Sequence, residues 1–187
     1  MRMETHSLPL KDGRACELRS PEPEDAAKML EYLKRTAAET HFLLRGPDEV
    51  LMTEEEERAF LQARLEDDHG VMIAAFLDGE VIASLGIAAV GPRKKVCHRA
   101  EFGMAVVQDY WGLGLGRELI EIAIEKAKSM GFEQLELGVF SDNHRARRMY
   151  EAFGFEQWGR MKQAYKLADG SYRDELLMGR PLSENDS

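Results

Sequence analysis

The feature that most constrains this fold is a set of alternate glycines that leads directly into an amphipathic helix. Gly112, Gly114 and Gly116 precede residues 117–130, in which apolar residues recur at helical spacing. A glycine-rich turn at a helix N-terminus presents unpaired backbone N–H groups and the positive end of the helix dipole. Together these groups bind a phosphate or a diphosphate. The pattern therefore predicts an anion site at this turn.

A strand is predicted on each side of that helix. Residues 96–107 read as a long strand, and residues 135–140 alternate between apolar and polar side chains. A strand–helix–strand unit places its two strands in parallel, so we expect parallel pairing here within an otherwise antiparallel sheet. A short helix over residues 143–153 follows and is stopped by Gly154.

Two more helices are predicted nearer the N-terminus, after a first strand at residues 15–19. One begins at Ser20, where a capping hydroxyl, prolines and acids follow one another. The other begins at Thr53, which forms a capping-box pattern with the acidic run 54–57. We interpret that run as the charged first turn of a solvated helix and not as a lure for a cationic substrate. The buried stripe expected on the first helix is Ala26, Ala27, Met29, Leu30 and Leu33, and Ala59, Phe60 and Ala63 continue the second helix.

Further strands complete the predicted sheet. Residues 71–77 and 80–90 are joined by Asp78-Gly79, a strong hairpin signal, and strand-like segments around 155–162 and 172–179 close the chain. We predict an α+β fold, with a mixed, mostly antiparallel sheet and helices on both faces in three α-β-α layers. The 187 residues suit one domain, so we expect a single domain over residues 1–187 with a core over about 15–181 and disordered termini.

Charge and cysteine content argue against several classes of partner. The net charge of -9 disfavours non-specific nucleic-acid binding, which needs a basic surface. Cys16 and Cys97 cannot form a disulfide framework, and we expect both to be small buried strand residues, not acyl carriers. No apolar run approaches the roughly 20 residues of a membrane span. We therefore expect a cytoplasmic protein without a nucleic-acid or membrane partner.

Other glycine-rich phosphate loops fit the sequence less well. A Walker loop needs Lys-Ser or Lys-Thr after its last glycine, and Arg117 follows Gly116 instead. A dinucleotide fingerprint needs Gly-x-Gly-x-x-Gly after the first strand, whereas the spacing here is Gly-x-Gly-x-Gly late in the chain. The remaining alternative is a helix start that merely tolerates glycine, at about 1 kcal/mol for each one.

The segment from Ala100 to Phe155 resembles the acyl-CoA-binding core of the GCN5-related N-acetyltransferases, the GNAT family. The family pattern is Gln/Arg-x-x-Gly-x-Gly/Ala, followed by Asn-x-x-Ala-x-x-x-Tyr-x-x-x-Gly-Phe. Trp111 departs from it, because the family often has Gln or Arg at this position. Weaker similarity in the flanks extends the resemblance over nearly the whole chain. The matching residues are Gly114 and Gly116 in the first part and Asn143, Ala146, Tyr150, Gly154 and Phe155 in the second.

This resemblance implies an acetyltransferase that moves an acetyl group from acetyl-CoA to a primary amine, by direct attack within a ternary complex and without a metal. Strand main-chain groups would pair with the pantetheine amides, and the glycine turn would hold the diphosphate. Arg148 is a further candidate for the nucleotide phosphates, or else a solvated side chain. The expected cofactor-binding residues are Met104, Ala105, Val106, Trp111, Gly112, Leu113, Gly114, Leu115, Gly116, Arg117, Asn143 and Tyr150.

Glu101 is the candidate general base. An amine with a pKa near 10.4 is neutral in only about one of 2,500 molecules at pH 7, so its deprotonation costs roughly 4.6 kcal/mol. A nearby carboxylate lowers that cost, and the family often carries a glutamate ten or eleven residues before the Gln/Arg position. The alternative role for Glu101 is an ion pair with Arg99, two residues away. His98 and His144 are alternative bases, and no residue spacing indicates a metal site.

Tyr150 matches the family's general acid, which protonates the leaving thiolate, and Asn143 would lie near the pantetheine arm or a bound water. Helical spacing puts both residues on one side of helix 143–153. The alternative for Tyr150 is an edge residue of an amphipathic helix with its hydroxyl in water.

The acceptor is not predicted by these motifs. We expect the second helix, residues 41–52 and the terminal hairpin to line its pocket, and small amines, polyamines and protein amines all remain open. A homodimer through the edge strands is a further option. Two other functions stay as alternatives: a non-catalytic acyl-CoA-binding or sensing module, and a nucleotide-binding protein that uses only the glycine loop.

Overall fold

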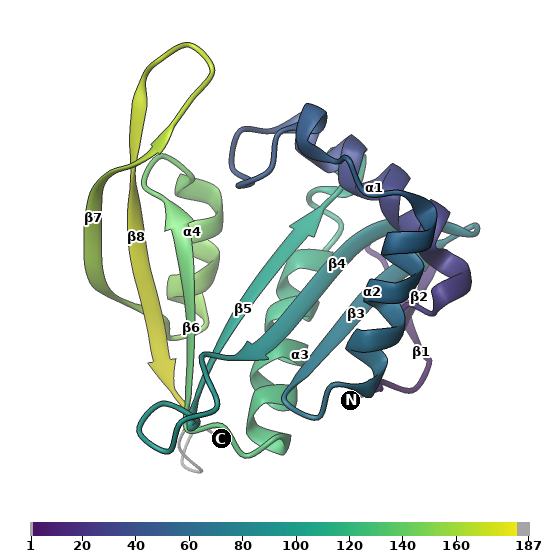
Figure 1. Ribbon diagram of the computed structural model, residues 1–187, viewed down its shortest axis with the longest axis horizontal. Helices are drawn as coiled ribbons and strands as arrows, with labels where there is room; N and C mark the ends of the chain where they lie inside the picture. Colours follow the sequence, from purple (N-terminus) through teal and green to yellow (C-terminus); the bar gives the residue numbers. More distant parts are fainter. Residues whose placement is uncertain (1, 183–187) are drawn as a thin grey trace. The chain divides into compact units, whose positions relative to one another are not determined.

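A computed structural model describes residues 2–182, which form eight strands and four α-helices (Figure 1). The strands follow the order β1-β2-β3-β4-β5-β6-β8-β7 and most neighbours pair antiparallel, which confirms the predicted α+β class. The strands are β1 (His6–Pro9), β2 (Ala15–Arg19), β3 (Gly70–Leu77), β4 (Glu80–Ala89), β5 (Arg99–Val106), β6 (Gln134–Phe140), β7 (Glu156–Lys166) and β8 (Tyr172–Pro181). The α-helices are α1 (Ala26–Glu39), α2 (Glu54–Glu66), α3 (Leu115–Ser129) and α4 (His144–Ala152).

The chain forms two compact units. The first unit comprises the residues up to Ala88 together with Gly103–Leu119, and the second comprises Ala89–Phe102 together with the residues from Ile120 onward. Strand β5 and helix α3 each contribute residues to both units. Each unit is therefore described separately below, and the single-domain organisation stays a prediction.

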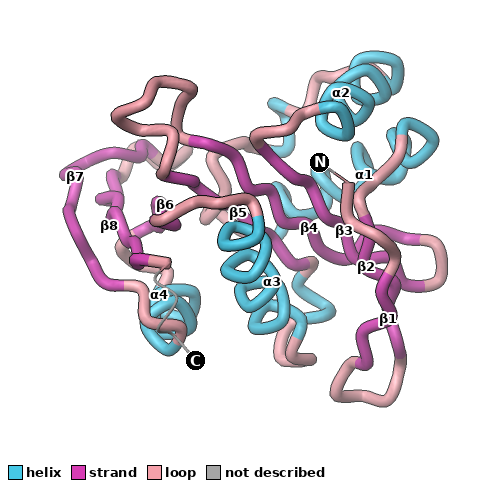
Figure 2. Tube along the Cα trace, turned by 90° about the horizontal axis from the view of Figure 1, so that it is seen from below, coloured by secondary structure: helices cyan, strands magenta, loops and turns pink. Residues whose placement is uncertain are grey.

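In the first unit, α1 and α2 lie on the same side of β3 and β4 (Figure 2). Thr53 caps α2 in the predicted capping box, accepting from the Glu56 N–H while the Glu56 carboxylate accepts from the Thr53 N–H. Apolar side chains from both helices and both strands form one core with the residue that follows β5. That core consists of Ala26, Met29, Tyr32, Leu61, Ala74, Phe76, Val81 and Val107.

Helix α2 continues through Ala59, Phe60 and Ala63, as predicted. Ala59, Phe60 and Ala63 are exposed, and the buried residues of this helix are Glu57 and Leu61. The two share a face because they are one helical turn apart, and Leu61 is the large aliphatic residue that this face packs into the core. Burial raises the pKa of Glu57, whose Oε1 has no hydrogen-bond partner among residues 2–182. On α1, the predicted buried stripe is wrong at Ala27, which is exposed. Tyr32 is buried instead.

The second unit contains the predicted parallel pair. Strands β5 and β6 run parallel with Arg99 opposite Gln134 and Glu101 opposite Glu136, and β6 pairs antiparallel with β8 along its whole length. Leu135, Leu137 and Val139 are buried, so one face of β6 belongs to the core of this unit. Helix α4 lies beside β6 (Figure 1). Trp158 of β7 is 45% exposed, and its ring occupies the space beside Gly179 of β8.

Two further elements differ from the predictions. Strand β1 was not expected; it is short, pairs antiparallel with β2 and is almost fully exposed, so it has no apolar alternation to detect. The terminal hairpin is longer than predicted, extending to Lys166 and Pro181. Met1 and residues 183–187 of the predicted disordered termini lie outside the described residues. Within residues 2–182, none of the helices combines the length and the apolar character needed to cross a membrane.

Candidate active site

The glycine turn lies in the first unit, between the end of β5 and the start of α3. The Val107 N–H donates to the Ile82 carbonyl at 2.9 Å, and a 3-10 turn over Gln108–Tyr110 follows. Gly112 and Gly114 then adopt left-handed backbone conformations, with φ of 85° and 96°. Glycine reaches these angles without the steric penalty that other residues meet, so both positions need it.

Five consecutive backbone N–H groups in this turn have no hydrogen-bond acceptor within residues 2–182. They belong to Gly112, Leu113, Gly114, Leu115 and Gly116. The next two N–H groups, those of Arg117 and Glu118, donate to the Gly114 carbonyl at 3.0 and 3.3 Å and begin the helix. Unpaired donors at the start of a 15-residue helix, next to its positive dipole end, fit a diphosphate.

Trp111 connects this turn to the end of β5. Its indole N–H donates to the Val106 carbonyl at 2.7 Å, while its side chain is 36% exposed. Helix α1 holds the turn from another side, because the Gln108 N–H donates to the Glu39 carboxylate and Arg35 pairs with Asp109, both at 2.7 Å. The residue that departs from the family pattern therefore has a structural role in the turn.

The end of β5 is held along one edge by a buried tyrosine that sequence reasoning missed. The Tyr32 hydroxyl donates to the Ala105 carbonyl at 2.8 Å and lies 3.0 Å from the Ser84 hydroxyl, and burial raises the pKa of this phenol. Successive residues of a strand direct their main-chain groups to opposite edges. Met104 and Val106 therefore direct theirs away from the edge that Ala105 shares with Tyr32.

Glu101 lies in the second unit, on the exposed side of β5. Arg99 does not pair with it; the Arg99 guanidinium instead makes two 2.8 Å hydrogen bonds to the Glu136 carboxylate. The alternative that Glu101 serves as the ion-pair partner of Arg99 is therefore wrong. No hydrogen bond or ion pair to the Glu101 carboxylate occurs in the described part of the chain.

Asn143 and Tyr150 lie on α4 in the same unit. Asn143 caps the helix, its Oδ1 accepting from the Ala146 N–H at 3.2 Å. Tyr150 is only 7% exposed, and its ring packs edge-to-face on Phe102, the residue after Glu101, with centroids 5.8 Å apart. Burial raises the pKa of Tyr150 to about 12. The alternative of an edge residue in water is therefore wrong, and the phenol keeps its proton at neutral pH.

Comparison with known proteins identifies the family. A model described as the Acetyltransferase (GNAT) family matches residues 26–155. The chain belongs to the GNAT family. As a member it is an acetyl-CoA-dependent acetyltransferase, and its named relatives are N-acetyltransferases.

Two curated enzymes illustrate the sequence similarity to this GNAT chain. It is 35% identical over 121 residues to the L-amino acid N-acetyltransferase AaaT of Escherichia coli (strain K12), a match covering 64% of this chain and 74% of that enzyme. It is also 35% identical over 82 residues to the ribosomal protein bS18-alanine N-acetyltransferase of the same strain, covering 44% and 55%.

Solved structures show the GNAT fold as well. An acetyltransferase of the GNAT family from Streptococcus pneumoniae matches with a TM-score of 0.82 and 33% identity, over 88% of this chain and 98% of that one. The yncA protein of Salmonella typhimurium, solved with acetyl-CoA, matches with a TM-score of 0.77 and 20% identity over 92% and 96%. At 20% identity the second likeness concerns the fold alone.

The remaining residues that the sequence singled out in this GNAT protein take no part in the contacts described above. His144 and Arg148 are exposed on α4, and His98 contributes its carbonyl to the Glu133 N–H at 2.8 Å. Cys16 is buried in β2 as predicted, whereas Cys97 is exposed and precedes β5, so the buried strand position predicted for it is wrong; neither forms a disulfide. Within residues 2–182, no group of three or more His, Cys, Asp or Glu residues is placed to hold a metal ion.

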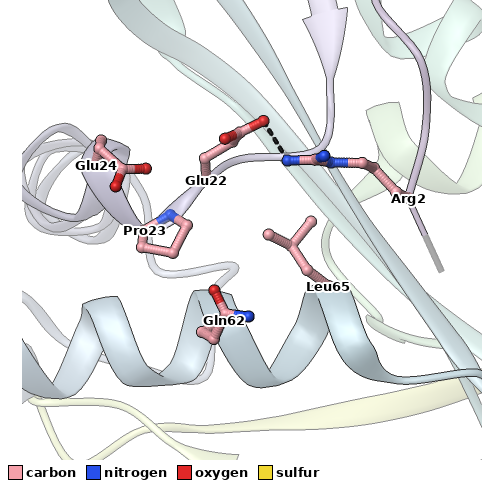
Figure 3. A pocket seen from close by; sticks show the side chains of 6 residues that line it. All are labelled: Arg2, Glu22, Pro23, Glu24, Gln62 and Leu65. Atoms are coloured by element: carbon pink, nitrogen blue, oxygen red, sulfur yellow. Dashed lines mark hydrogen bonds and ion pairs between the residues drawn. The ribbon is translucent and has the colours of Figure 1, made fainter.

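A polar pocket of about 350 Å³ lies elsewhere in the first unit and contains none of the predicted site residues (Figure 3). The ion pair between Arg2 and Glu22 crosses it. It is lined by Arg2, Glu22, Pro23, Glu24, Gln62 and Leu65.

Proposed function

We propose that this GNAT protein transfers the acetyl group of acetyl-CoA to a primary amine by direct attack within a ternary complex. The observation that carries the proposal is the run of five unpaired N–H groups at the start of α3, within a chain of this family. The family match runs through both units, which supports our proposal that they act as one N-acetyltransferase domain.

The cofactor would be held mainly by the main chain. We propose that the N–H groups from Gly112 to Gly116 receive the diphosphate, with Trp111 shaping the turn and Arg117 adding charge. The main-chain groups of Met104 and Val106 would pair with the pantetheine amides like an added strand, with Ala105 between them. Bound acetyl-CoA supplies the acyl group as a thioester, which a neutral amine can attack.

Glu101 would act as the general base. It takes a proton from the acceptor ammonium, directly or through a water, so that the amine nitrogen can form a bond to the acetyl carbonyl carbon. This role is supported by the absence of an ion-pair partner for Glu101 in the described chain, since Arg99 pairs with Glu136 instead. A carboxylate without an ion-pair partner is free to contact the acceptor ammonium.

Tyr150 would act as the general acid. As the carbon–sulfur bond breaks, its hydroxyl donates its proton to the departing thiolate, and the second proton that the acceptor nitrogen loses on becoming an amide restores the phenol. A phenol with a pKa of about 12 is protonated at neutral pH, which supports this role. We propose that Asn143 assists by donating from its side-chain NH₂ group to the pantetheine arm or a water, since its Oδ1 already caps α4.

The named relatives support a chemical class of acceptor and not a single compound. Relatives are named for L-amino acids, for the alanine of a ribosomal protein and for methionine sulfoximine, which supports a primary amine on a small molecule or a protein. We propose a cytoplasmic enzyme, a reducing compartment being compatible with two unpaired cysteines. A homodimer through the edge strands remains a prediction.

The test is release of free CoA thiol from acetyl-CoA in the presence of a panel of amino acids, polyamines and peptides with free N-termini. We expect saturable release with at least one acceptor class and a matching acetylated product. The alternative is a non-catalytic acyl-CoA-binding module, which predicts tight CoA binding in calorimetry without release for any acceptor. No binding of CoA at all would overturn both.

A further inference from the structure

The turn between β1 and β2 lies against the glycine turn over residues 112–116, which we call the phosphate loop after its proposed role. The Lys11 N–H donates to the Leu113 carbonyl at 3.2 Å, and the Arg14 guanidinium lies over the Tyr110 ring, 5.3 Å from its centroid. Both contacts belong to the first unit. A segment distant in sequence is therefore fixed beside the unpaired N–H groups.

The Lys11 side chain runs along Gly114. Its Cε, Cγ and Cδ lie 3.5, 3.7 and 3.9 Å from the position that a Cβ on Gly114 would take. The lysine stem thus occupies the space that this glycine leaves open, and the ammonium lies one bond beyond the closest of these atoms. Glycine at 114 therefore accommodates both a left-handed backbone and a neighbouring lysine.

Charges around the loop distinguish Lys11 from its neighbours. Arg14 is paired with Asp12 and Arg35 with Asp109, each at 2.7 Å. Lys11 is exposed and forms no ion pair with any residue of the described chain. The whole protein carries a net charge of -9, so a diphosphate needs local positive charge to approach it.

We propose that Lys11 is a phosphate-binding residue of the cofactor site, its ammonium contacting the diphosphate of CoA while the N–H groups of Gly112–Gly116 cradle it. This inference rests on the proposed function, in which the loop binds CoA. Lysine binds phosphate as a flexible point charge, which suits a side chain reaching in from another segment. It compensates for Trp111, which stands where the family often has a polar side chain.

Calorimetry with three ligands tests the assignment. Lys11→Gln should weaken the binding of CoA and of dephospho-CoA by about tenfold each. Pantetheine, which has no phosphate, should bind as it does to the unchanged protein. The salt dependence of CoA affinity should become shallower, because one charge contact is lost.

Two further variants serve as controls. Lys11→Arg keeps the charge and should bind CoA within about twofold of the unchanged protein. Lys34→Gln removes an exposed lysine from α1 and should have no effect. The Lys11 main-chain bond to Leu113 does not depend on its side chain, so thermal unfolding of Lys11→Gln should match that of Lys34→Gln.

Unchanged affinity of Lys11→Gln for CoA would overturn the proposal. A loss for CoA but not for dephospho-CoA would overturn it too, because Lys11 would then contact the 3′-phosphate and not the diphosphate. Failure of the unchanged protein to bind CoA would instead remove the proposed function, so the two failures are distinguishable.

Discussion

The phosphate loop of the first unit and the α4–β5 contacts of the second use different parts of the chain for the roles proposed above. In the loop, five main-chain N–H groups are unpaired in the described chain and are proposed to bind an anion, and the Trp111 side chain holds the turn. On α4 and β5, the groups proposed to react are side chains, the phenol of Tyr150 and the carboxylate of Glu101. A main-chain site depends on backbone angles and tolerates many side chains, whereas a side-chain site depends on one functional group.

The largest effect is expected from a branched side chain at Gly114. Gly114→Val must adopt φ near 96° and displace the Lys11 stem, so the loop N–H groups move out of place. We expect CoA affinity, measured by calorimetry, to fall at least about 100-fold, or roughly 2.7 kcal/mol.

Gly79→Val is the matched control. Gly79 has φ of 85° in the β3–β4 turn and no atom within 4 Å of its Cβ position, so it introduces similar backbone strain away from the loop. Both variants should lose stability, but only Gly114→Val should lose CoA binding. If both bound CoA normally, the loop would not depend on its backbone angles.

Removing one oxygen from Tyr150 tests the side-chain site. Tyr150→Phe should lower kcat by about tenfold or more, because the leaving thiolate loses its proton donor. The dissociation constant of CoA should stay within about twofold, since the ring still packs on Phe102. Equal turnover in steady-state kinetics would remove this hydroxyl from the mechanism.

Glu101→Gln should lower kcat/KM for the acceptor by about tenfold at pH 7 and by less at pH 9.5, where more of the amine is already neutral. Glu136→Gln is the control: it removes the partner of Arg99 and leaves the Glu101 carboxylate in place. A pH-independent loss in Glu101→Gln, or an equal loss in Glu136→Gln, would argue for a structural role.

Trp111→Phe sharpens the contrast, since it keeps a ring but removes the indole N–H that holds the Val106 carbonyl. We expect CoA affinity to fall about fivefold, in line with the loss of one hydrogen bond, with kcat unchanged. A loss as large as that of Gly114→Val would mean that side chains govern the loop after all.

The smallest effect concerns stability at high pH. The folded-state pKa of Tyr150, about 12, is above its usual value near 10, so its stabilising effect is complete below pH 10 and is lost as pH rises toward 12. Between pH 9 and 11 the unchanged protein should lose about 1 kcal/mol more unfolding free energy than Tyr150→Phe. Urea titrations at both pH values measure this, and parallel losses would mean that the phenol is hydrated.

Local chemistry made much of the fold predictable. The Thr53 cap, the Asp78-Gly79 turn and the parallel pairing of β5 with β6 follow from short patterns that act within or next to one element. The buried face of α2 was not predicted, because Phe60 and Leu61 are both apolar and only packing selects Leu61 for the core. Strand β1 is short and exposed, and so leaves no periodic signal.

The same contrast applies to the site. The glycine turn and Tyr150 belong to contiguous motifs and were visible in the sequence. Lys11 and Tyr32 reach their positions through tertiary contacts with Leu113 and Ala105, about 70 to 100 residues away along the chain. The Arg99–Glu136 pair likewise joins neighbouring strands. Contacts of this kind depend on register and packing, which no local pattern encodes.

The protein contains two tryptophans, Trp111 and Trp158, and one falls in each unit. Both indoles are partly open to solvent. Single-tryptophan variants would therefore carry an intrinsic fluorophore in either half of the molecule, without any attached dye. Emission from Trp111 would report events at the phosphate loop, and emission from Trp158 would report events at the terminal hairpin.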